Sequence, residues 1–358
     1  MTERESQIYQ WIKENPMITQ QEIADRASIT RSSAAVHVSN LMKKGMIRGK
    51  GYVLQEENYI TVVGAVNVDI SGTPDQQLMD GDSNPGKMRI SFGGVGRNIA
   101  ENISRLGGHA EMITVLGDDF YAAEIEKSCR TLGIELQHTL RVTGESTSTY
   151  LCINNEKGDM AVAVSDMGIY EKLTPEYLES KMPMINKGRL LVIDANIPEE
   201  SIVYLAEMCS VPIFAEPVST RKALKLSKIL NRIYLLKPNL LELELLSGRQ
   251  VKNKKELDLA MDILLEKGVK NLTVSMGSNG VYYGTKEGKK HYPCLPCKVV
   301  NTTGCGDALM GAIAWAVQMK EPVSSAIRYG LAASSICIEH YGAISKELTA
   351  ASLLKRLE

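Results

Sequence analysis

The 358-residue sequence predicts an α/β protein: a three-layer sandwich with a mostly parallel central sheet and a small β lid, preceded by a small winged helix-turn-helix domain. From about residue 59 onwards, strand-like and helix-like stretches alternate, which favours parallel strands with helices on both faces. Short alternation of apolar and polar residues around 86–92 and 147–165 favours antiparallel strands beside the main sheet. Three short amphipathic helical patterns come before residue 46.

Residues 1–57 are expected to form the winged helix-turn-helix domain. Pro16 ends the first helix, because proline disfavours the α conformation of the residue before it. Thr19 begins the second helix with a capping-box pattern. Thr30 begins the third helix and Gly45 ends it.

A β-hairpin and a basic surface are expected at the end of this domain. Apolar stretches at 46–48 and 52–54 flank a glycine-rich turn and predict the hairpin, or wing. Residues 31–55 contain five Lys or Arg residues and no Asp or Glu, which favours nucleic-acid binding. The side chains expected to contact DNA are Arg31, Ser32, Ser33, His37, Arg48 and Lys50. The alternative is a protein-interaction or dimerisation module with a solvated basic face.

Residues 58–358 are expected to form the sandwich, with lid strands around 70–92 and 147–165. Strands of the central sheet are predicted at 59–64, 110–116, 189–194, 211–215, 232–236 and 271–275. Helices are predicted at 97–106, 120–132, 199–208, 220–230, 239–247, 254–267, 306–319 and 323–339. Ligand sites of such sheets lie at the carboxyl ends of the parallel strands.

A glycine-rich segment, 301–307, precedes an apolar run that is typical of a buried helix. The backbone N–H groups of Gly304, Cys305 and Gly306 would converge at the helix N-terminus, where the helix dipole favours an anion. Asp307 lies beside them and could accept the proton of an attacking hydroxyl during phosphoryl transfer. A glycine-rich turn with an aspartate cap explains the same residues without any chemistry.

Two further segments follow predicted strands at the same edge of the sheet. Asn239 and Glu242 could hold water molecules around Mg²⁺, although helix capping explains this pair as well. Ser275, Gly277 and Gly280 would allow close approach of a nucleotide, although a tight turn explains the glycines equally well.

Polar residues near the start of the larger domain are candidates for sugar binding. Asn67 and Asp69 directly follow the first predicted strand. Gly93 and Gly94 precede a helix that carries Asn98. Asp69 and Asn98 would bind vicinal hydroxyl groups, and the two glycines would let the backbone come close. The glycine pattern differs from a dinucleotide-binding GxGxxG motif, so no such site is expected.

Residues from about 60 to 350 resemble the ribokinase-like (PfkB) carbohydrate and nucleoside kinases. The resemblance rests on four segments in the order of that family: Gly93-Gly94 with Asn98, Asn239 with Glu242, Ser275 with Gly277, and 302–307. It implies a ribokinase-like sandwich, ATP and Mg²⁺ as cofactors, Asp307 as catalytic base and an anion hole made by the amides of 304–306.

The same resemblance assigns roles to the other candidates. It implies that Asn239 and Glu242 organise Mg²⁺ and phosphates, that Ser275 and Gly277 approach ATP, and that Asp69 and Asn98 bind the sugar. The lid of this family often also serves for dimerisation, so a homodimer through the lid is expected.

Within the family, the sequence is similar to the pseudouridine kinases. The segments 82–86, 93–102 and 163–167 resemble that group, as does a fused helix-turn-helix, and Asp166 becomes a candidate substrate ligand. The resemblance implies phosphorylation of the 5′-hydroxyl of pseudouridine, giving pseudouridine 5′-phosphate. Two alternatives stay open: another kinase of the family, acting on ribose, adenosine, inosine or a hexose, and a transcription regulator that senses a sugar or nucleoside.

Two positions depart from the family pattern. Asn301 stands where aspartate is usual, and in relatives that position and the threonine two residues later, here Thr303, help to bind a monovalent cation. The lost charge puts K⁺ dependence in doubt. Cys305 stands where alanine is usual, and its small thiol should still fit although it would be oxidisable.

Composition and charge exclude several classes of protein. A net charge of −1 gives no overall attraction to nucleic acid or membranes, so such binding would need a local patch. No apolar stretch approaches the length needed to span a membrane, and the polar N-terminus is unlike a signal peptide. Seven scattered cysteines suit a reducing cytoplasm, and Cys294 and Cys297 have no second pair or histidine nearby to complete a zinc site. We therefore expect a soluble, cytoplasmic protein without a membrane partner.

Overall fold

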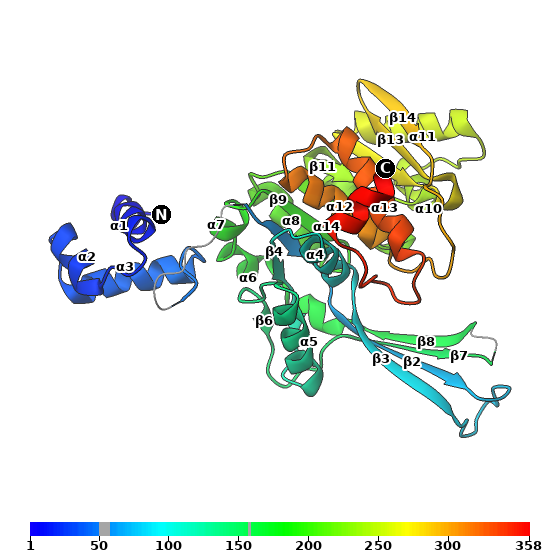
Figure 1. Cartoon of the computed structure of the whole chain (residues 1–358), viewed down its shortest axis with the longest axis horizontal. Helices are drawn as coiled ribbons and strands as arrows, with labels where there is room; N and C mark the ends of the chain where they lie inside the picture. Colours follow the sequence, from blue (N-terminus) through cyan, green and yellow to red (C-terminus); the bar gives the residue numbers. More distant parts are fainter. Residues whose placement is uncertain (50–57, 157–158) are drawn as a thin grey trace.

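The computed structural model describes residues 1–49, 58–156 and 159–358. A small helical domain lies at the N-terminal end, beside a larger α/β body from which an arm of long strands projects (Figure 1). Within the described residues, no helix has the length and apolar character needed to cross a membrane.

The described part of the N-terminal domain consists of three helices around a core of its own. They are α1 (Glu3–Glu14), α2 (Gln20–Ala27) and α3 (Arg31–Lys43). Thr2 and Thr19 begin the first two helices with capping boxes, and the Thr30 hydroxyl caps the third. Their shared core contains Ile8, Ile12, Ile23, Ala34, Val38 and Leu41. Most of the predicted wing, including Lys50, lies outside the described residues.

The described part of the body is built on an eight-stranded sheet with the order β14-β13-β12-β11-β10-β9-β1-β4. Its strands are β1 (Ile60–Val63), β4 (Ala110–Ile113), β9 (Leu190–Asp194), β10 (Ile213–Glu216), β11 (Ile233–Leu236), β12 (Asn271–Ser275), β13 (Val281–Thr285) and β14 (Gly288–Tyr292). The six strands β4, β1, β9, β10, β11 and β12, in this order across the sheet, pair in parallel. The hairpin β13-β14 adds two antiparallel strands at one edge. The parallel strands are largely apolar because helices cover both faces.

Helices form a layer on each face of this sheet. One layer contains α4 (Val95–Arg105), α12 (Cys305–Gln318) and α13 (Val323–Cys337), with α5 (Phe120–Thr131) beside them and α14 (Ala350–Leu357) packed on α13. The other contains α6 (Pro175–Glu179), α7 (Met182–Ile185), α8 (Glu199–Met208), α9 (Thr220–Ala223), α10 (Leu240–Ser247) and α11 (Lys254–Glu266). The predicted three-layer sandwich with a mostly parallel sheet is confirmed.

The projecting arm, here called the lid, is a sheet with the order β3-β2-β7-β8 (Figure 1). Its strands are β2 (Asn67–Pro74), β3 (Gly86–Gly93), β7 (Thr149–Asn154) and β8 (Met160–Asp166). Register aligns Asp69 with Ser91, and Val68 with Phe92. Because side chains alternate across a strand, Asp69 lies on one face of the lid and a row of apolar residues on the other.

Several details differ from the predicted elements. The stretch 110–116 forms two strands, since β5 (Val115–Leu116) leaves the main sheet and pairs with β6 (Leu140–Arg141). Residues 220–230 form one α-helical turn, α9, followed by 3-10 turns, because the chain must bury Leu226, Ile229 and Leu230 while it bends into β11. The 3-10 elements are η1 (Gly168–Lys172), η2 (Leu224–Lys228), η3 (Leu230–Arg232) and η4 (Gly277–Asn279).

Candidate active site

The N-terminus of α12 is shaped for the close approach of an anion. Gly304 precedes the helix with φ +81, and a Cβ at this position would lie 1.9 Å from the carbonyl oxygen of Ala343. Only glycine fits there. No side chain from the described residues caps α12, so the N–H groups of the first turn, which includes Cys305 and Gly306, can face a ligand.

Asp307, in the first turn of α12, is hydrogen-bonded to α4, the helix that follows the lid strand β3. Its Oδ2 accepts a hydrogen bond of 2.8 Å from Asn98 Nδ2, and Asn98 lies on α4. Burial raises the pKa of Asp307 to about 6, although the Asn98 bond and the positive charge of Lys237 oppose the shift. A carboxylate with this pKa suits a general base that works near neutral pH.

A buried ion pair that the sequence analysis missed lies against the start of α12. Lys237 Nζ is 2.9 Å from Glu216 Oε2, and both side chains are almost fully buried. A Cβ added to Gly306 would lie 3.2 Å from Lys237 Nζ. Burial acts to lower the pKa of Lys237, but the carboxylates of Glu216, Asp307 and Glu242 hold it above the usual value. An ammonium group that is paired with a carboxylate therefore borders the N-terminus of α12.

The missed lysine had a signal in the sequence. Lys237 directly follows β11, a parallel strand, and so lies at the carboxyl edge of the sheet. A basic residue at that edge is a candidate phosphate ligand even before its partners are known.

Asn239 and Glu242 form a capping box at the start of α10. The Glu242 N–H donates to Asn239 Oδ1, and the Asn239 N–H donates to Glu242 Oε2, both at 2.9 Å. Glu242 is buried, and burial raises its pKa against the opposing effects of the Asn239 bond and Lys237.

The capping bonds do not use every acceptor position of this pair. An ionised carboxylate has more acceptor positions than its one capping bond uses, so Glu242, although buried, could also hold a water molecule of a hydrated cation. One carboxylate and one amide fit Mg²⁺ that keeps most of its water. Within the described residues there is no cluster of three or more His, Cys, Asp or Glu side chains for a site made by protein alone.

The segment after β12 lies beside Asn239. A β-bridge pairs Asn239 with Ser275, and the Ser275 N–H donates to the Pro238 carbonyl at 2.9 Å. Gly277 has φ +56 and open space where a Cβ would stand, so a ligand can approach its backbone. At Gly280, a Cβ would lie 2.2 Å from a backbone oxygen of β14, so the tight turn accounts for this glycine.

Asp69 and the start of α4, the candidate sugar-binding residues, lie together at the base of the lid. A Cβ on Gly93 would lie 2.0 Å from Asp69 Oδ2, so glycine is needed for the carboxylate to lie there, and Gly94 starts α4 with φ +93. Burial raises the pKa of Asp69 to about 6, opposed by Arg97. The buried Oδ1 of Asn98 has no partner among the described residues, which leaves it to accept a hydroxyl.

The other two candidate substrate ligands have different surroundings. Asn67 Oδ1 accepts a hydrogen bond of 2.8 Å from Ser148 Oγ at the base of the lid. Asp166 is exposed, and the register of β8, β7 and β2 aligns it with Val68. Its side chain therefore lies on the face of the lid opposite to Asp69.

Asn301 and Thr303, the candidate ligands of a monovalent cation, are held by local hydrogen bonds. Asn301 Oδ1 accepts a bond of 3.0 Å from the Thr303 N–H, and Asn301 Nδ2 donates to the Tyr341 carbonyl at 2.8 Å. An aspartate could not make the second bond, so the amide has a role of its own. Next to it, a hydrogen bond with Cys337 holds the pKa of Cys305 below its usual value.

The candidate DNA-contacting residues do not share one surface. Arg31, Ser32 and Ser33 are exposed at the start of α3, and His37 is partly buried. Arg48 instead turns towards the body and pairs with Glu111. Lys50 lies outside the described residues.

Comparisons with known proteins agree with this geometry. Residues 57–350 match the family model described as pfkB family carbohydrate kinase, and residues 1–48 match a winged helix-turn-helix DNA-binding model. The chain is 34% identical to the uncharacterized sugar kinase YeiI of Escherichia coli (strain K12), over 94% of this chain and 93% of that one. It is also 34% identical to a pseudouridine kinase of the same bacterium, over 85% and 98%. A ribokinase structure from Thermotoga maritima superposes with a TM-score of 0.74 at 25% identity, covering 84% of this chain and 99% of the other.

Proposed function

Because the chain belongs to the pfkB family of carbohydrate kinases, we propose that it transfers the γ-phosphate of ATP to the 5′-hydroxyl of pseudouridine. The family assigns the reaction class, a phosphotransfer to an alcohol, while the nucleoside, the position and the residue roles are the proposal. The observation that carries these roles is the Asn98–Asp307 hydrogen bond. It links a carboxylate of raised pKa, at the anion-binding helix, to the sugar side of the site.

The proposed reaction is a direct in-line transfer. Asp307 accepts the proton of the attacking hydroxyl while its oxygen bonds to the γ-phosphorus and ADP leaves. The N–H groups of 304–306 and the Lys237 ammonium lie where charge grows on the phosphoryl oxygens. Asn98 orients Asp307 with its Nδ2 and accepts a sugar hydroxyl with its Oδ1, while Asp69 accepts another.

ATP is proposed to lie along the edge formed by the ends of β11 and β12, beside Ser275 and Gly277. Bound Mg²⁺ would neutralise phosphate charge, held through water by Asn239 and Glu242. Asn301 and Thr303 are the candidate ligands of K⁺. Because the Asn301 amide is already bonded to a neighbouring carbonyl, we expect turnover without a strict K⁺ requirement.

Pseudouridine is favoured among the nucleosides and sugars because relatives from Escherichia coli and Arabidopsis thaliana are named pseudouridine kinase. The chain covers 98% of the Escherichia coli pseudouridine kinase at 34% identity. The same identity to the sugar kinase YeiI, over 94% of this chain, keeps ribose, adenosine, inosine and hexoses as alternatives.

The decisive experiment is Mg²⁺/ATP turnover across pseudouridine, uridine, adenosine, inosine, ribose and fructose. Preferential phosphorylation of pseudouridine supports both the chemistry and the substrate. Preference for another compound keeps the chemistry and discards the substrate. No turnover at all favours a regulator that senses a sugar or nucleoside.

A second proposed activity is DNA binding by the N-terminal domain. It is supported by the family match of residues 1–48 and by the exposed Arg31, Ser32 and Ser33 at the start of α3. A gel-shift assay with DNA flanking the gene tests it. Salt-sensitive, sequence-dependent binding supports the activity, and its absence removes it.

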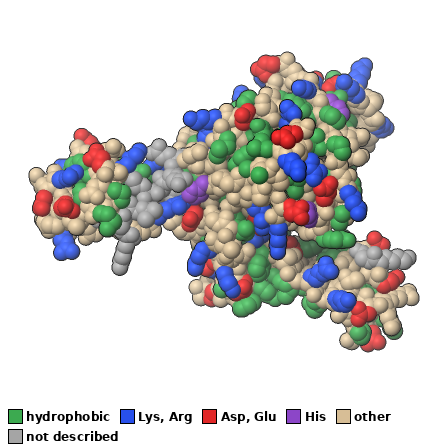
Figure 2. All heavy atoms as spheres, in the orientation of Figure 1, with side chains coloured by type: hydrophobic (Ala, Val, Ile, Leu, Met, Phe, Trp, Pro, Cys, Tyr) green, Lys and Arg blue, Asp and Glu red, His purple; other side chains and the backbone are tan. Residues whose placement is uncertain are grey.

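We also propose that the lid forms a homodimer. Large apolar side chains that share the Val68 face of the lid are exposed: Met88, Ile90, Met160, Val162 and Val164. Contiguous exposed apolar surface of this kind is typical of an interface. In the space-filling view, hydrophobic side chains gather where the lid leaves the body (Figure 2).

A further inference from the structure

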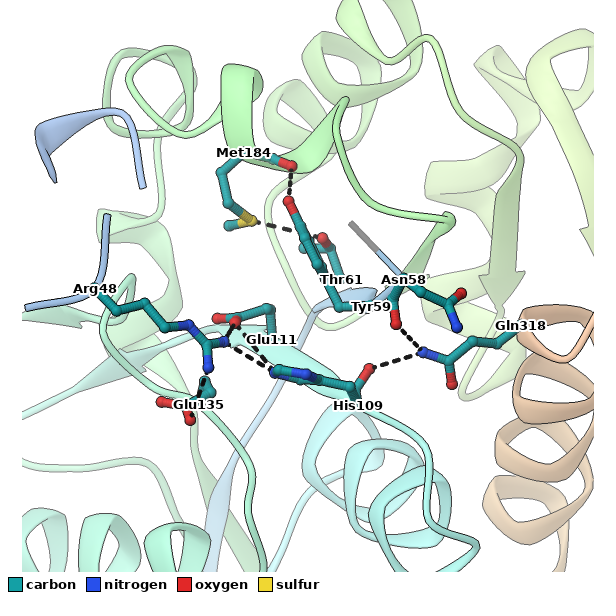
Figure 3. A network of polar contacts seen from close by, with 9 residues as sticks. All are labelled: Arg48, Asn58, Tyr59, Thr61, His109, Glu111, Glu135, Met184 and Gln318. Carbon is teal, nitrogen blue, oxygen red and sulfur yellow. Dashed lines mark hydrogen bonds and ion pairs between the residues drawn. The ribbon is translucent and has the colours of Figure 1, made fainter. Parts of the chain in front are cut away.

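The N-terminal domain is docked on the body through Arg48 (Figure 3). The Arg48 guanidinium pairs with the Glu111 carboxylate, lies 3.4 Å from Glu135 Oε1 and is 2.9 Å from His109 Nε2. The Arg48 side chain is 18% exposed and that of Glu111 only 1%. Such a shielded pair is weakly screened by salt, and losing one partner leaves an uncompensated buried charge.

Other contacts fix the same docked arrangement. Lys187 Nζ donates to the Tyr9 hydroxyl at 2.8 Å and lies 3.6 Å from Met46 Sδ. Gly45, directly after α3, fits against His138, since a Cβ there would lie 3.0 Å from the His138 Nε2. The segment that leads from α3 to the expected wing is therefore an interface with the body.

Docking separates the candidate DNA-contacting residues. The start of α3 is exposed, whereas Arg48 is mostly buried against the body. DNA phosphates are bound chiefly by Lys and Arg side chains that neutralise them. A guanidinium enclosed between Glu111, Glu135 and His109 cannot reach a phosphate while the domain is docked.

The docking site also contacts the far end of the anion-binding helix. Gln318, the last residue of α12, donates from Nε2 to the Asn58 carbonyl at 2.6 Å and lies 3.4 Å from the His109 carbonyl (Figure 3). Asp307 lies in the first turn of the same helix. Helix α12 therefore begins at the proposed phosphate-transfer site and ends in contact with His109, whose ring contacts Arg48.

We propose that this junction is a latch: the body and DNA compete for Arg48, and α12 connects the latch to the phosphate-transfer site. The proposal rests on the proposed DNA binding of residues 1–48. Because linkage is reciprocal, a change on the body side that weakens the Arg48–Glu111 pair strengthens DNA binding, and DNA binding in turn releases the domain from the body.

The test uses the full-length protein and two fluorescent duplexes, one from the region flanking the gene and one of random sequence, followed by anisotropy. Glu111→Gln weakens the latch from the body side and leaves the N-terminal domain unchanged. Glu126→Gln is the matched control, because it removes the same charge from α5, where Glu126 pairs with Arg141. We expect Glu111→Gln to bind DNA about fivefold more tightly than the control, a shift within the usual range of coupling energies.

A double-mutant cycle assigns the effect to Arg48. Arg48→Ala removes the contacts of this side chain with both the body and DNA. In that background, Glu111→Gln should no longer change the DNA affinity. An equal gain in both backgrounds would overturn the competition for Arg48.

Ligands test the connection through α12. A non-hydrolysable ATP analogue with Mg²⁺ and pseudouridine should shift the DNA affinity of the wild-type protein and leave that of Glu111→Gln unchanged. An unshifted wild-type affinity in the presence of bound ligand overturns this connection.

The failures are distinguishable. If the wild-type protein binds DNA and Glu111→Gln binds no more tightly than Glu126→Gln, the latch is wrong. If no variant binds either duplex, DNA binding fails and the latch with it, while kinase turnover is judged separately. Thermal unfolding followed by circular dichroism reports whether Glu111→Gln is folded; if it is not, Glu135→Gln, at the more exposed partner, takes its place.

Discussion

Asp307 occupies the position where a small chemical change should have the largest effect. Its carboxylate is bonded to Asn98 and lies in the first turn of α12. Asp307→Asn keeps the size of the side chain but removes the proton acceptor, so we expect kcat to fall by about 10²–10⁴-fold. Steady-state kinetics with calorimetric measurement of ATP binding checks this. Retention of more than about a tenth of kcat would contradict the assignment as base.

The pKa of Asp307 predicts an acid limb in the pH profile. Since burial raises this pKa to about 6, the carboxyl is protonated below that pH and ionised above it. A base must be ionised to act, so kcat/KM should fall as the pH decreases through about 6. Asp69 has a similar pKa, so the variant Asp69→Asn is needed to assign the limb. We expect this variant to have a higher KM and to keep the acid limb, because Asp307 is unchanged. Loss of the limb in that variant would assign it to Asp69.

Lys237 is expected to contribute through charge. Lys237→Met should lower kcat by about 100-fold, because the ammonium group borders Gly306 and would stabilise the charge that grows on the phosphoryl oxygens in the proposed site. The single change also leaves Glu216 buried without its partner. Lys237→Met/Glu216→Gln removes both charges and should restore thermal stability without restoring turnover. If turnover returns with stability, Lys237 has a structural role only.

At the scale of elements, the site is assembled by helix termini and strand ends. α12 provides the anion-binding N–H groups, α4 provides Asn98, and α10 begins with the Asn239–Glu242 capping box. Each helix starts at the carboxyl edge of the sheet or beside the lid, and the positive end of its dipole would favour the phosphates in the proposed site. Residues far apart in the sequence thereby contribute to one site.

The exposed apolar face of the lid is the proposed dimer interface. Val164→Lys places a charge in the middle of the exposed apolar face and should convert a dimer to a monomer, measured by light scattering. Ser165→Lys, the next residue of β8, points to the other face and is the matched control. A wild-type protein that stays monomeric at high concentration would contradict the lid dimer.

At the scale of the whole molecule, we expect the N-terminal domain to stabilise the body through the Arg48–Glu111 pair. Arg48→Met would leave the buried Glu111 carboxylate with less compensation, although His109 remains beside it. We expect the free energy of unfolding of the body to fall by about 1–3 kcal/mol, less than for a fully buried pair because Arg48 is partly exposed. Denaturant unfolding measures this, with Arg31→Met on the exposed face of α3 as control. Equal stabilities of the two variants would show that docking does not support the body.

Sequence patterns predicted most of the fold because they depend on local chemistry. The apolar parallel strands, the capping threonines and the alternating lid strands each carry a period or a cap that can be seen in a short window. The helix expected at 220–230 is confirmed only in part: its first turn is α-helical, and 3-10 turns follow it and bury Leu226, Ile229 and Leu230. The hairpin β13-β14 was not predicted although its two strands are adjacent in the sequence, and only its position at the edge of the sheet depends on the tertiary structure.

By itself, the sequence determined the α/β sandwich and marked the segments that supply Asp307, Asn98, Asn239 and Glu242, since glycine-rich turns and helix caps are local signals. Only the tertiary structure decided which groups meet. It placed Lys237 and Glu216 against the anion-binding helix, aligned Asp166 with the face opposite to Asp69, and turned Arg48 from the expected wing into the body. The physical reason is that burial and charge pairing depend on distances between strands and domains, which no short stretch of sequence contains.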